Sequence, residues 1–169
     1  MIVSRECKYD GYFSVDELSI KTRNGSVVSR EVMNRKDGVC AIVYDTVNAD
    51  FIFVEQYRPG AGVRLLEVPA GTLDIPGEDP KEAIIREIDE EIGYKVDYID
   101  FMTKCYMSPG GSTELIHFYF ATVSEQLHAG GGTPTEDIDI IRIKEEDIFD
   151  TEFLDAKTLL AIQYYFQEH

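Results

Sequence analysis

The sequence predicts an α/β fold in which a mixed β-sheet is covered by helices on both faces, an α/β/α sandwich. Two apolar runs, residues 39–45 and 51–58, have few polar interruptions and therefore suit strands buried in such a sheet. Residues 80–92 carry isoleucine at every fourth position, which gives a helix with one apolar stripe. Residues 155–169 repeat an apolar helical face, and we expect this last helix to pack on the sheet as well.

The chain has 169 residues, which is enough for one domain with a sizeable core. We expect a single domain over residues 1–169, with an N-terminal β-hairpin extension at 1–37 and the main core at 38–169. The hairpin is predicted at residues 11–36, where two strand-like segments flank an Asn-Gly turn at 24–25. Two strands with few apolar residues are poorly stable alone, so this hairpin needs another surface to lie on.

Three further elements complete the core. Residues 94–107 predict one long strand or a pair of strands, residues 115–123 alternate as a strand, and residues 145–150 predict a short acidic helix. Before the first helix, the segment LLEVPAG at residues 65–71 leads into a loop. Its acidic residue, Glu67, is either an outer acidic group of a site or a strand residue that faces solvent, and we favour the solvent-facing position.

Composition excludes several classes of partner. The net charge of -16 argues against nucleic acid or an anionic membrane, because both attract basic surfaces. No apolar run reaches the roughly 18 residues of a membrane span, and the first residues lack the apolar core of a signal peptide, so we expect a cytoplasmic protein. Cys7, Cys40 and Cys105 are odd in number and widely spaced, which fits reduced thiols and neither a disulfide framework nor a zinc site.

The helix at residues 80–92 has well-marked ends. Asp79 is a suitable N-cap residue and Pro80 takes the first helical position. Gly93 is the residue at which the helix should stop.

The same helix carries a row of carboxylates. Glu87, Glu90 and Glu91 fall at positions i, i+3 and i+4, where each like-charged pair costs roughly 0.2–0.5 kcal/mol in water. A hard divalent cation such as Mg²⁺ takes carboxylate oxygens and would offset this repulsion. Arg86 lies one turn before Glu90 and could orient its carboxylate. The alternative is a solvated acidic face, and the loop before the helix is what favours the metal.

That loop and helix resemble a known motif. Gly71, Glu78 and the run from Arg86 to Tyr94 are similar to the Nudix box, G-x5-E-x7-R-E-U-x-E-E-x-G-U with U aliphatic. The match from Glu78 onward is complete if the tyrosine is accepted as the last U. Six residues, and not five, separate Gly71 from Glu78, and a turn at residues 76–77 can absorb the extra one.

A second loop indicates the branch of the family. A Ser-Pro-Gly-Gly sequence alone is an ordinary turn. Here Pro109 stands 16 residues beyond Gly93, which is similar to the ADP-ribose and nucleotide-sugar pyrophosphatase branch of the Nudix hydrolases. The run YMSPGGSTELIHF and the later AGGGTPTEDIDI resemble most closely the bacterial GDP-mannose pyrophosphatases.

The resemblance implies a Nudix α/β/α sandwich and an enzyme. Its expected reaction is the metal-dependent hydrolysis of the pyrophosphate bond of a nucleoside diphosphate sugar, GDP-mannose or ADP-ribose, to a nucleoside monophosphate and a sugar 1-phosphate. The expected cofactor is Mg²⁺ or Mn²⁺, with two or three ions per site. In this branch the N-terminal piece reaches across to a twin subunit, so the resemblance also implies a homodimer.

The resemblance further implies the residues of the site. They are Glu87, Glu90, Glu91 and Glu136 as catalytic residues; the backbone carbonyl of Ala70 with Glu87, Glu91 and Glu136 as metal ligands; and Tyr12, Arg30, Arg35, Arg58, Gly71, Glu114 and Lys157 as substrate-binding residues. Of these, Tyr12, Arg30 and Arg35 are expected to contact the nucleotide across the dimer.

Three of these assignments have alternatives. Lys157, near the start of the last helix, is either a solvated charge or a substrate contact, and the resemblance favours the contact. Arg58, at a strand end, is either a structural salt bridge or a phosphate clamp, and the resemblance favours the clamp. The glycine-rich segment at residues 129–137 is either a flexible surface loop or a mobile arm that brings Glu136 to the metals. Where relatives carry another acidic residue, this chain has Pro134 and Thr135, so the base that activates water is not assigned.

Two other functions compete with the enzyme. A non-catalytic Nudix module could bind a nucleotide sugar or ADP-ribose as a sensor, but all the box carboxylates are present here. An acidic metal-buffering protein would leave Arg58 and the Ser-Pro-Gly-Gly loop without a role.

Overall fold

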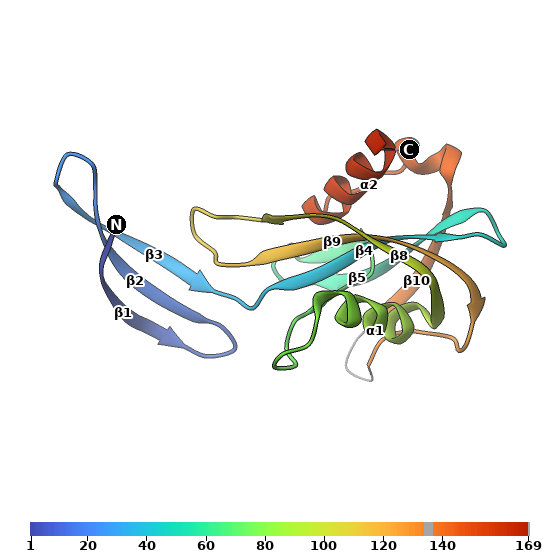
Figure 1. The fold of residues 1–169 in the computed structure, drawn as a ribbon, viewed down its shortest axis with the longest axis horizontal. Helices are drawn as coiled ribbons and strands as arrows, with labels where there is room; N and C mark the ends of the chain where they lie inside the picture. Colours follow the sequence, from blue (N-terminus) through green and yellow to red (C-terminus); the bar gives the residue numbers. More distant parts are fainter. Residues whose placement is uncertain (134–136, 169) are drawn as a thin grey trace.

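A computed structural model of the chain, which describes residues 1–133 and 137–168, contains a seven-stranded sheet with a helix on each face and a three-stranded sheet beside it (Figure 1). Within the described part, no helix combines the length and the apolar character that crossing a membrane requires. The elements in chain order are β1 (Ile2–Asp10), β2 (Ser14–Lys21), β3 (Val27–Asn34), β4 (Gly38–Asp45), β5 (Asp50–Arg58), β6 (Val63–Glu67), β7 (Ala70–Thr72), α1 (Pro80–Ile92), β8 (Tyr94–Tyr106), β9 (Leu115–Gln126), β10 (Ile138–Lys144), the 3₁₀ helix η1 (Glu145–Asp150) and α2 (Ala156–Glu168).

The seven-stranded sheet is mixed, as predicted. Its strands follow the order β10-β5-β4-β9-β8, while β6 pairs with β5 and β7 with β4. Strands β4 and β9 run parallel, and the other paired strands run antiparallel. The two predicted apolar strands are β4 and β5, and the segment predicted as a long strand or a pair is the single strand β8.

The side chains of β4 alternate between two apolar cores, one on each face of the sheet. Val39, Ala41 and Val43 pack with the isoleucines of α1. Cys40 and Ile42 point to the other face, where they pack with residues of β5 and α2. Because both faces are covered, every one of these positions is apolar and the strand is a continuous apolar run. The predicted α/β/α sandwich is confirmed.

Helix α1 begins and ends where the sequence predicts. The Asp79 side chain accepts a hydrogen bond from the backbone N–H of Lys81 at 2.8 Å, and Pro80 takes the first helical position. Gly93 ends the helix with a φ of 74°. A Cβ at Gly93 would lie 2.1 Å from the carbonyl oxygen of His128, so glycine is required there for space as well as for backbone conformation.

The N-terminal extension has one strand more than predicted. The predicted hairpin is present as β2 and β3, and β1 pairs with β2 to give an antiparallel sheet of order β1-β2-β3. Every residue of β1 is exposed, so the strand lacks the alternation of apolar and polar residues that marks a half-buried strand. In Figure 1 this sheet stands at one end of the molecule, beside the sandwich.

The N-terminal sheet joins the core through the loop at residues 108–114. Met33, on β3, donates its backbone N–H to the carbonyl of Gly111 at 2.8 Å and accepts one from the N–H of Thr113 at 3.1 Å. The backbone N–H of Arg35 donates to the Thr113 hydroxyl at 2.9 Å. The Ser-Pro-Gly-Gly loop therefore holds the N-terminal sheet against the core, in addition to the covalent link from β3 to β4 at residues 35–37.

A buried carboxylate fastens the opposite end of the large sheet. Asp45, at the end of β4, is fully buried and accepts hydrogen bonds from Nη1 and Nη2 of Arg142 on β10, at 2.9 and 2.5 Å. It also accepts from the backbone N–H groups of Val47 and Asn48 and from the Asn48 side chain. Burial alone would raise the pKa of Asp45, but these hydrogen bonds and the Arg142 charge outweigh it and lower the pKa.

Replacing Arg142 should therefore destabilise the fold. We expect Arg142→Met to lower the free energy of unfolding by about 2–3 kcal/mol, because Asp45 keeps its other donors but loses the charge that compensates its burial. Since the folded-state pKa of Asp45 is lowered, this contribution is complete above the ordinary carboxyl pKa of about 4 and is lost as the pH falls below it. Urea unfolding followed by circular dichroism at neutral and acidic pH measures both effects.

Lys144→Met is the matched control on the same strand. Lys144 is half exposed and lies 3.6 Å from Asp50, which Arg142 also contacts. We expect this substitution to cost less than about 1 kcal/mol. Equal unfolding free energies for the two variants would contradict the role given to Asp45.

Candidate active site

A cleft of about 900 Å³ lies between the N-terminal sheet, helix α1 and the start of α2. Ten of the residues predicted for the site line it: Tyr12, Arg35, Arg58, Ala70, Gly71, Glu87, Glu90, Glu91, Glu114 and Lys157. Arg30 is on β3 but is not part of this lining among the described residues, and its Nη1 donates to the carbonyl of Ser29 at 2.7 Å. Glu136 lies outside the described residues.

The cleft also contains residues that were not predicted from the sequence. Lys36 lines it beside Arg35, so the adjacency of two basic residues was a usable signal. Asp155 lines it just before the first residue of α2. Thr133, at the end of the glycine-rich run, lines it as well.

Arg86 forms ion pairs with three carboxylates, two of which belong to the acidic row. Its Nε lies 3.1 Å from Glu78, and its Nη1 lies 2.8 Å from Glu87 and 3.3 Å from Glu90. The contact with Glu90 was predicted, and those with Glu78 and Glu87 extend it. The hydrogen bond to Glu78, followed by the charge of Glu87, raises the pKa of Arg86 above its ordinary value. One permanent cation therefore offsets part of the repulsion within the row.

Glu91 is held by the strand in front of the helix. Its side chain is buried, at 3% exposure, and its Oε2 accepts a hydrogen bond from the backbone N–H of Ala70 at 3.0 Å. The carbonyl of Ala70 is a metal ligand predicted from the family resemblance. The structure adds a second role for this residue, because its N–H fixes a carboxylate of the acidic row.

Gly71 provides the space in which Glu87 lies. A Cβ on Gly71 would come within 2.1 Å of the Glu87 carboxyl carbon and of its Oε1. The Glu87 side chain is therefore packed directly against the backbone of β7. A side chain at Gly71 could be accommodated only by moving the Glu87 carboxylate away.

These groups suit a hard divalent cation. Glu87 and Glu91 are one helical turn apart, and the carboxylates meet the backbone of Ala70 and Gly71. Such oxygen donors are the ligands that Mg²⁺ and Mn²⁺ prefer. Among residues 1–133 and 137–168, no group of three or more His, Cys, Asp or Glu side chains converges as a metal-binding cluster. The third predicted carboxylate ligand, Glu136, is outside these ranges.

Glu67 was expected to face solvent, and this expectation is wrong. Its side chain is 1% exposed, and its two oxygens accept hydrogen bonds from Nε and Nη2 of Arg58, each at 2.6 Å. The ammonium of Lys157 contacts the same carboxylate. Burial alone would raise the pKa of Glu67, but Arg58 and Lys157 outweigh it and lower the pKa. Two cations from elsewhere in the chain make the buried position possible.

Arg58 therefore forms the structural salt bridge that was one of its two predicted roles, and its side chain also lies at the cleft. Its guanidinium is fixed by Glu67, and the hydrogen bond between them raises the pKa of Arg58. Its side chain remains 38% exposed and lines the cleft. A role as phosphate clamp is compatible with this position and stays a prediction.

Helix α2 is tied to the same region through its first turn. Asp155 Oδ2 accepts hydrogen bonds from the N–H and the hydroxyl of Thr158, at 2.9 and 2.7 Å, and lies 3.0 Å from Lys157 Nζ. The Thr158 hydroxyl, fully buried, accepts from the backbone N–H of Val68 at 2.9 Å. The C-terminal helix thus fixes the position of Lys157 relative to Glu67.

The glycine-rich segment begins as a cap on α1. The backbone N–H of Gly131 donates to the carbonyl of Glu91 at 2.8 Å, and that of Gly132 donates to the carbonyl of Glu90 at 3.0 Å. Both glycines have positive φ. At the last residue of the segment, Arg64 Nη1 lies 2.8 Å from Asp137. The described chain up to Thr133 is therefore attached next to the acidic row, and Thr133 lines the cleft, whereas neither Arg64 nor Asp137 is part of the described lining.

Two predicted substrate-binding residues pair with each other. Nε of Arg35 lies 2.9 Å from Glu114, the last residue of the loop at 108–114. The pair brings the N-terminal extension to the cleft within one chain.

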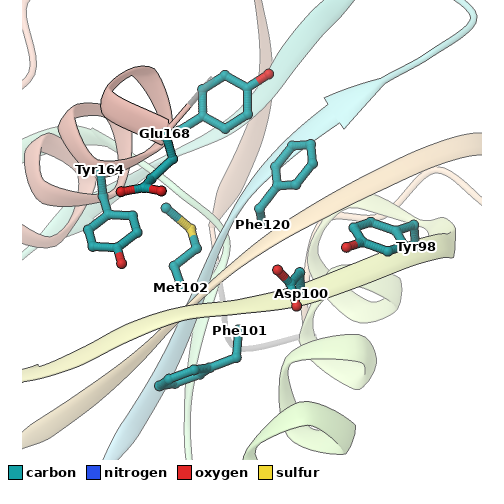
Figure 2. A pocket seen from close by; sticks show the side chains of 8 residues that line it. Tyr98, Asp100, Phe101, Met102, Phe120, Tyr164 and Glu168 are labelled. Atoms are coloured by element: carbon teal, nitrogen blue, oxygen red, sulfur yellow. The ribbon is translucent and has the colours of Figure 1, made fainter.

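A second hollow, of about 270 Å³, lies between β8, β9 and the end of α2 (Figure 2). Figure 2 shows Phe120, Met102 and Tyr164 around it, with the carboxylates of Asp100 and Glu168 on different sides. Both carboxylates belong to exposed residues. No residue predicted for the site lines this hollow in the described chain, whereas ten of them line the larger cleft.

Comparison with known families agrees with this site. The profile of the family described as NUDIX domain matches residues 34–162, which is most of the chain. The chain therefore belongs to the Nudix hydrolase family, and the family identification made from the sequence is confirmed.

Individual relatives are similar over nearly the whole chain. The GDP-mannose pyrophosphatase of Salmonella arizonae is 34% identical, over 95% of this chain and 91% of the relative. The GDP-mannose pyrophosphatase of Escherichia coli strain K12 is 32% identical over the same shares. A solved structure described as an ADP compounds hydrolase superposes with a TM-score of 0.86 at 22% identity, covering 99% of this chain and 92% of its own. That structure shows the shared fold.

The close contact at Gly71 gives a test of the predicted metal site. We expect Gly71→Ala to weaken Mn²⁺ binding roughly tenfold, because the new methyl displaces the Glu87 carboxylate from the backbone of β7. The fold should survive, since a flexible side chain can move. Isothermal titration with Mn²⁺ measures the affinity, and a thermal melt checks the fold.

Gly110→Ala is the control, because a Cβ there meets nothing within 4 Å and Gly110 is not part of the described cleft lining. Its affinity for Mn²⁺ should equal that of the wild type. An unchanged affinity in Gly71→Ala would show that Glu87 does not hold the metal.

Proposed function

We propose that this chain hydrolyses the pyrophosphate bond of a nucleoside diphosphate sugar in a metal-dependent reaction, giving a nucleoside monophosphate and a sugar 1-phosphate. Family membership and the relatives named as GDP-mannose pyrophosphatases support this class of reaction. GDP-mannose is the substrate that we propose first, and ADP-ribose is the second. The observation that carries the proposal is a single cleft that combines a row of carboxylates with several cationic side chains.

The carboxylates are the proposed metal-binding part. Glu87, Glu91, Glu136 and the Ala70 carbonyl would hold two or three Mg²⁺ or Mn²⁺ ions. When bound, such ions neutralise charge on the diphosphate, lower the pKa of water and stabilise the leaving phosphate. Arg86 keeps the Glu87 carboxylate in place, and the Ala70 N–H does the same for Glu91. The chain thus orients two of the proposed ligands by contacts that do not need the metal.

The cations are the proposed diphosphate-binding part. Arg58 and Lys157 reach the cleft from β5 and α2 and would contact phosphate oxygens. Arg35 and Glu114, which pair at the junction of the two sheets, would contact the nucleotide and the sugar. A chain with a net charge of -16 repels free phosphates, so local cations and bound metal are needed to hold such a substrate.

Steady-state hydrolysis of GDP-mannose, ADP-ribose, UDP-glucose and a dinucleoside polyphosphate, each with Mg²⁺, tests the proposal. We expect a clear preference in kcat/KM for one nucleotide sugar. In Glu91→Gln, turnover should fall by on the order of 100-fold or more, because glutamine still accepts from Ala70 but lacks the charge that holds a metal. Glu82→Gln, an exposed change on the same helix, should keep the wild-type rate.

Near-full activity of Glu91→Gln would contradict the proposed mechanism. Saturable binding of a nucleotide sugar by the wild type without turnover would contradict the enzyme and identify a non-catalytic sensor module.

We also propose that the chain forms a homodimer through its N-terminal sheet, as the resemblance implies. Strand β1 is exposed throughout, and its apolar residues Ile2 and Val3 are 54% and 57% exposed. A small sheet with exposed apolar side chains is stabilised when another surface covers it. Tyr12, in the turn between β1 and β2, is 96% exposed yet belongs to the cleft lining, so a partner on this sheet would lie next to the cleft.

Light scattering after size-exclusion chromatography should give about twice the 19.2 kDa of one chain. Val3→Glu should shift the mass towards that of one chain, because it places a charge on the covered sheet. Val47→Glu, at a valine that is 69% exposed in the turn after β4, should leave the dimer intact. A single-chain mass for the wild type would rule the dimer out.

A further inference from the structure

Glu67 contributes no surface to the cleft in the described chain, yet it determines where two of the cleft's cations lie. Nε and Nη2 of Arg58 approach its two oxygens at 2.6 Å each, in a bidentate pair. Lys157 contacts Oε2, the same oxygen that Arg58 Nη2 contacts. One buried carboxylate therefore connects the end of β5 to the first turn of α2.

Stability of the fold alone does not explain why Glu67, Arg58 and Lys157 are brought together. Removing charged groups from water is costly, and apolar side chains of similar size often pack in such a place with equal or better stability. Arg58 and Lys157 carry like charges, so without the carboxylate between them they would repel each other and Arg58 would lose its fixed geometry, while Lys157 would keep its contact with Asp155. With Glu67 in place, both cations are held at the cleft wall while Arg58 remains 38% exposed towards it.

A second pair on the same strands shows what is particular to Glu67. Arg64 on β6 lies 3.0 Å from Glu55 on β5, and the two residues are nine positions apart, as are Arg58 and Glu67. The Glu55 side chain is 39% exposed, whereas that of Glu67 is 1% exposed. Neither Arg64 nor Glu55 is part of the described lining of the cleft. The two cross-strand pairs thus differ in burial and in their relation to the cleft.

We propose that Glu67 is a positioning residue that presents Arg58 and Lys157 to the diphosphate of the substrate. The inference rests on the proposed function, because it assumes that a nucleoside diphosphate occupies the cleft. Glu67 itself does not touch the substrate. It acts by fixing the distance and direction of two cations that arrive from separate elements.

The test compares Glu67→Gln with Glu55→Gln as the matched control. Isothermal titration with GDP and with ADP, each in Mg²⁺, should show that Glu67→Gln weakens the Kd roughly tenfold or more, since hydrogen bonds between charged groups are lost. KM for the preferred nucleotide sugar should rise by a similar factor with a smaller change in kcat, because the cations bind ground state and transition state alike. Glu55→Gln should match the wild type in Kd and KM, since Arg64 keeps Asp137 and Asp139.

The two proposals fail in different ways. A wild-type chain that binds neither GDP nor ADP and hydrolyses no nucleotide sugar would overturn the proposed function and this inference with it. A wild type that binds and hydrolyses, together with an unchanged Kd and KM in folded Glu67→Gln, would overturn the positioning role alone. Should Glu67→Gln fail to fold, Glu67→Asp replaces it in the test, because aspartate keeps the charge on a shorter side chain. Its Kd should lie between those expected for the wild type and for Glu67→Gln. A Kd equal to that of the wild type would overturn the inference.

Discussion

The geometry of the site depends on the buried carboxylate of Glu67, which has to stay paired with cations. It depends equally on the five-residue segment 67–71 that begins with this residue. Residues 67–71 together contact β4, β5, α1 and α2. Glu67 holds cations from β5 and α2, Val68 donates to the first turn of α2, and the carbonyl of Pro69 accepts from β4. Ala70 fixes one carboxylate of α1 and Gly71 makes room for another. Because all these contacts fall within five residues, one short segment fixes the positions of the carboxylates and the cations of the cleft relative to one another.

Features that are local in the sequence could be predicted from it. The limits of α1 follow from a cap, a proline and a glycine, and the acidic row follows from helical spacing alone. The two central strands are continuous apolar runs because helices cover both faces of the sheet. The positions of Ala70 and Gly71 beside the acidic helix came from the resemblance to a motif, since nothing in a strand-like tripeptide indicates what it faces.

Features that depend on contacts between distant residues could not be predicted. Glu67 reads as an exposed strand residue until Arg58 and Lys157 are known to meet it, and Lys157 is 90 positions away. Asp45 and Arg142 are 97 positions apart, and neither has a local pattern that marks it as buried and paired. Strand β1 was not predicted, for another reason. Its whole length is exposed, so its sequence has no alternation of apolar and polar residues that would indicate a strand paired with β2.

The glycine cap on α1 has a consequence for anyone who would transplant the Nudix helix into another scaffold. The carbonyls at its carboxyl end belong to Glu90 and Glu91, the same residues whose side chains form the acidic row, and they are satisfied by backbone groups some forty residues later in the chain. A graft of the helix alone would leave these acceptors to water or to the host, and the last turn would fray where two of the carboxylates are attached. A graft therefore has to include two separate segments, helix α1 and residues 128–132. The strands of the new scaffold would have to hold these two segments in the same relative position.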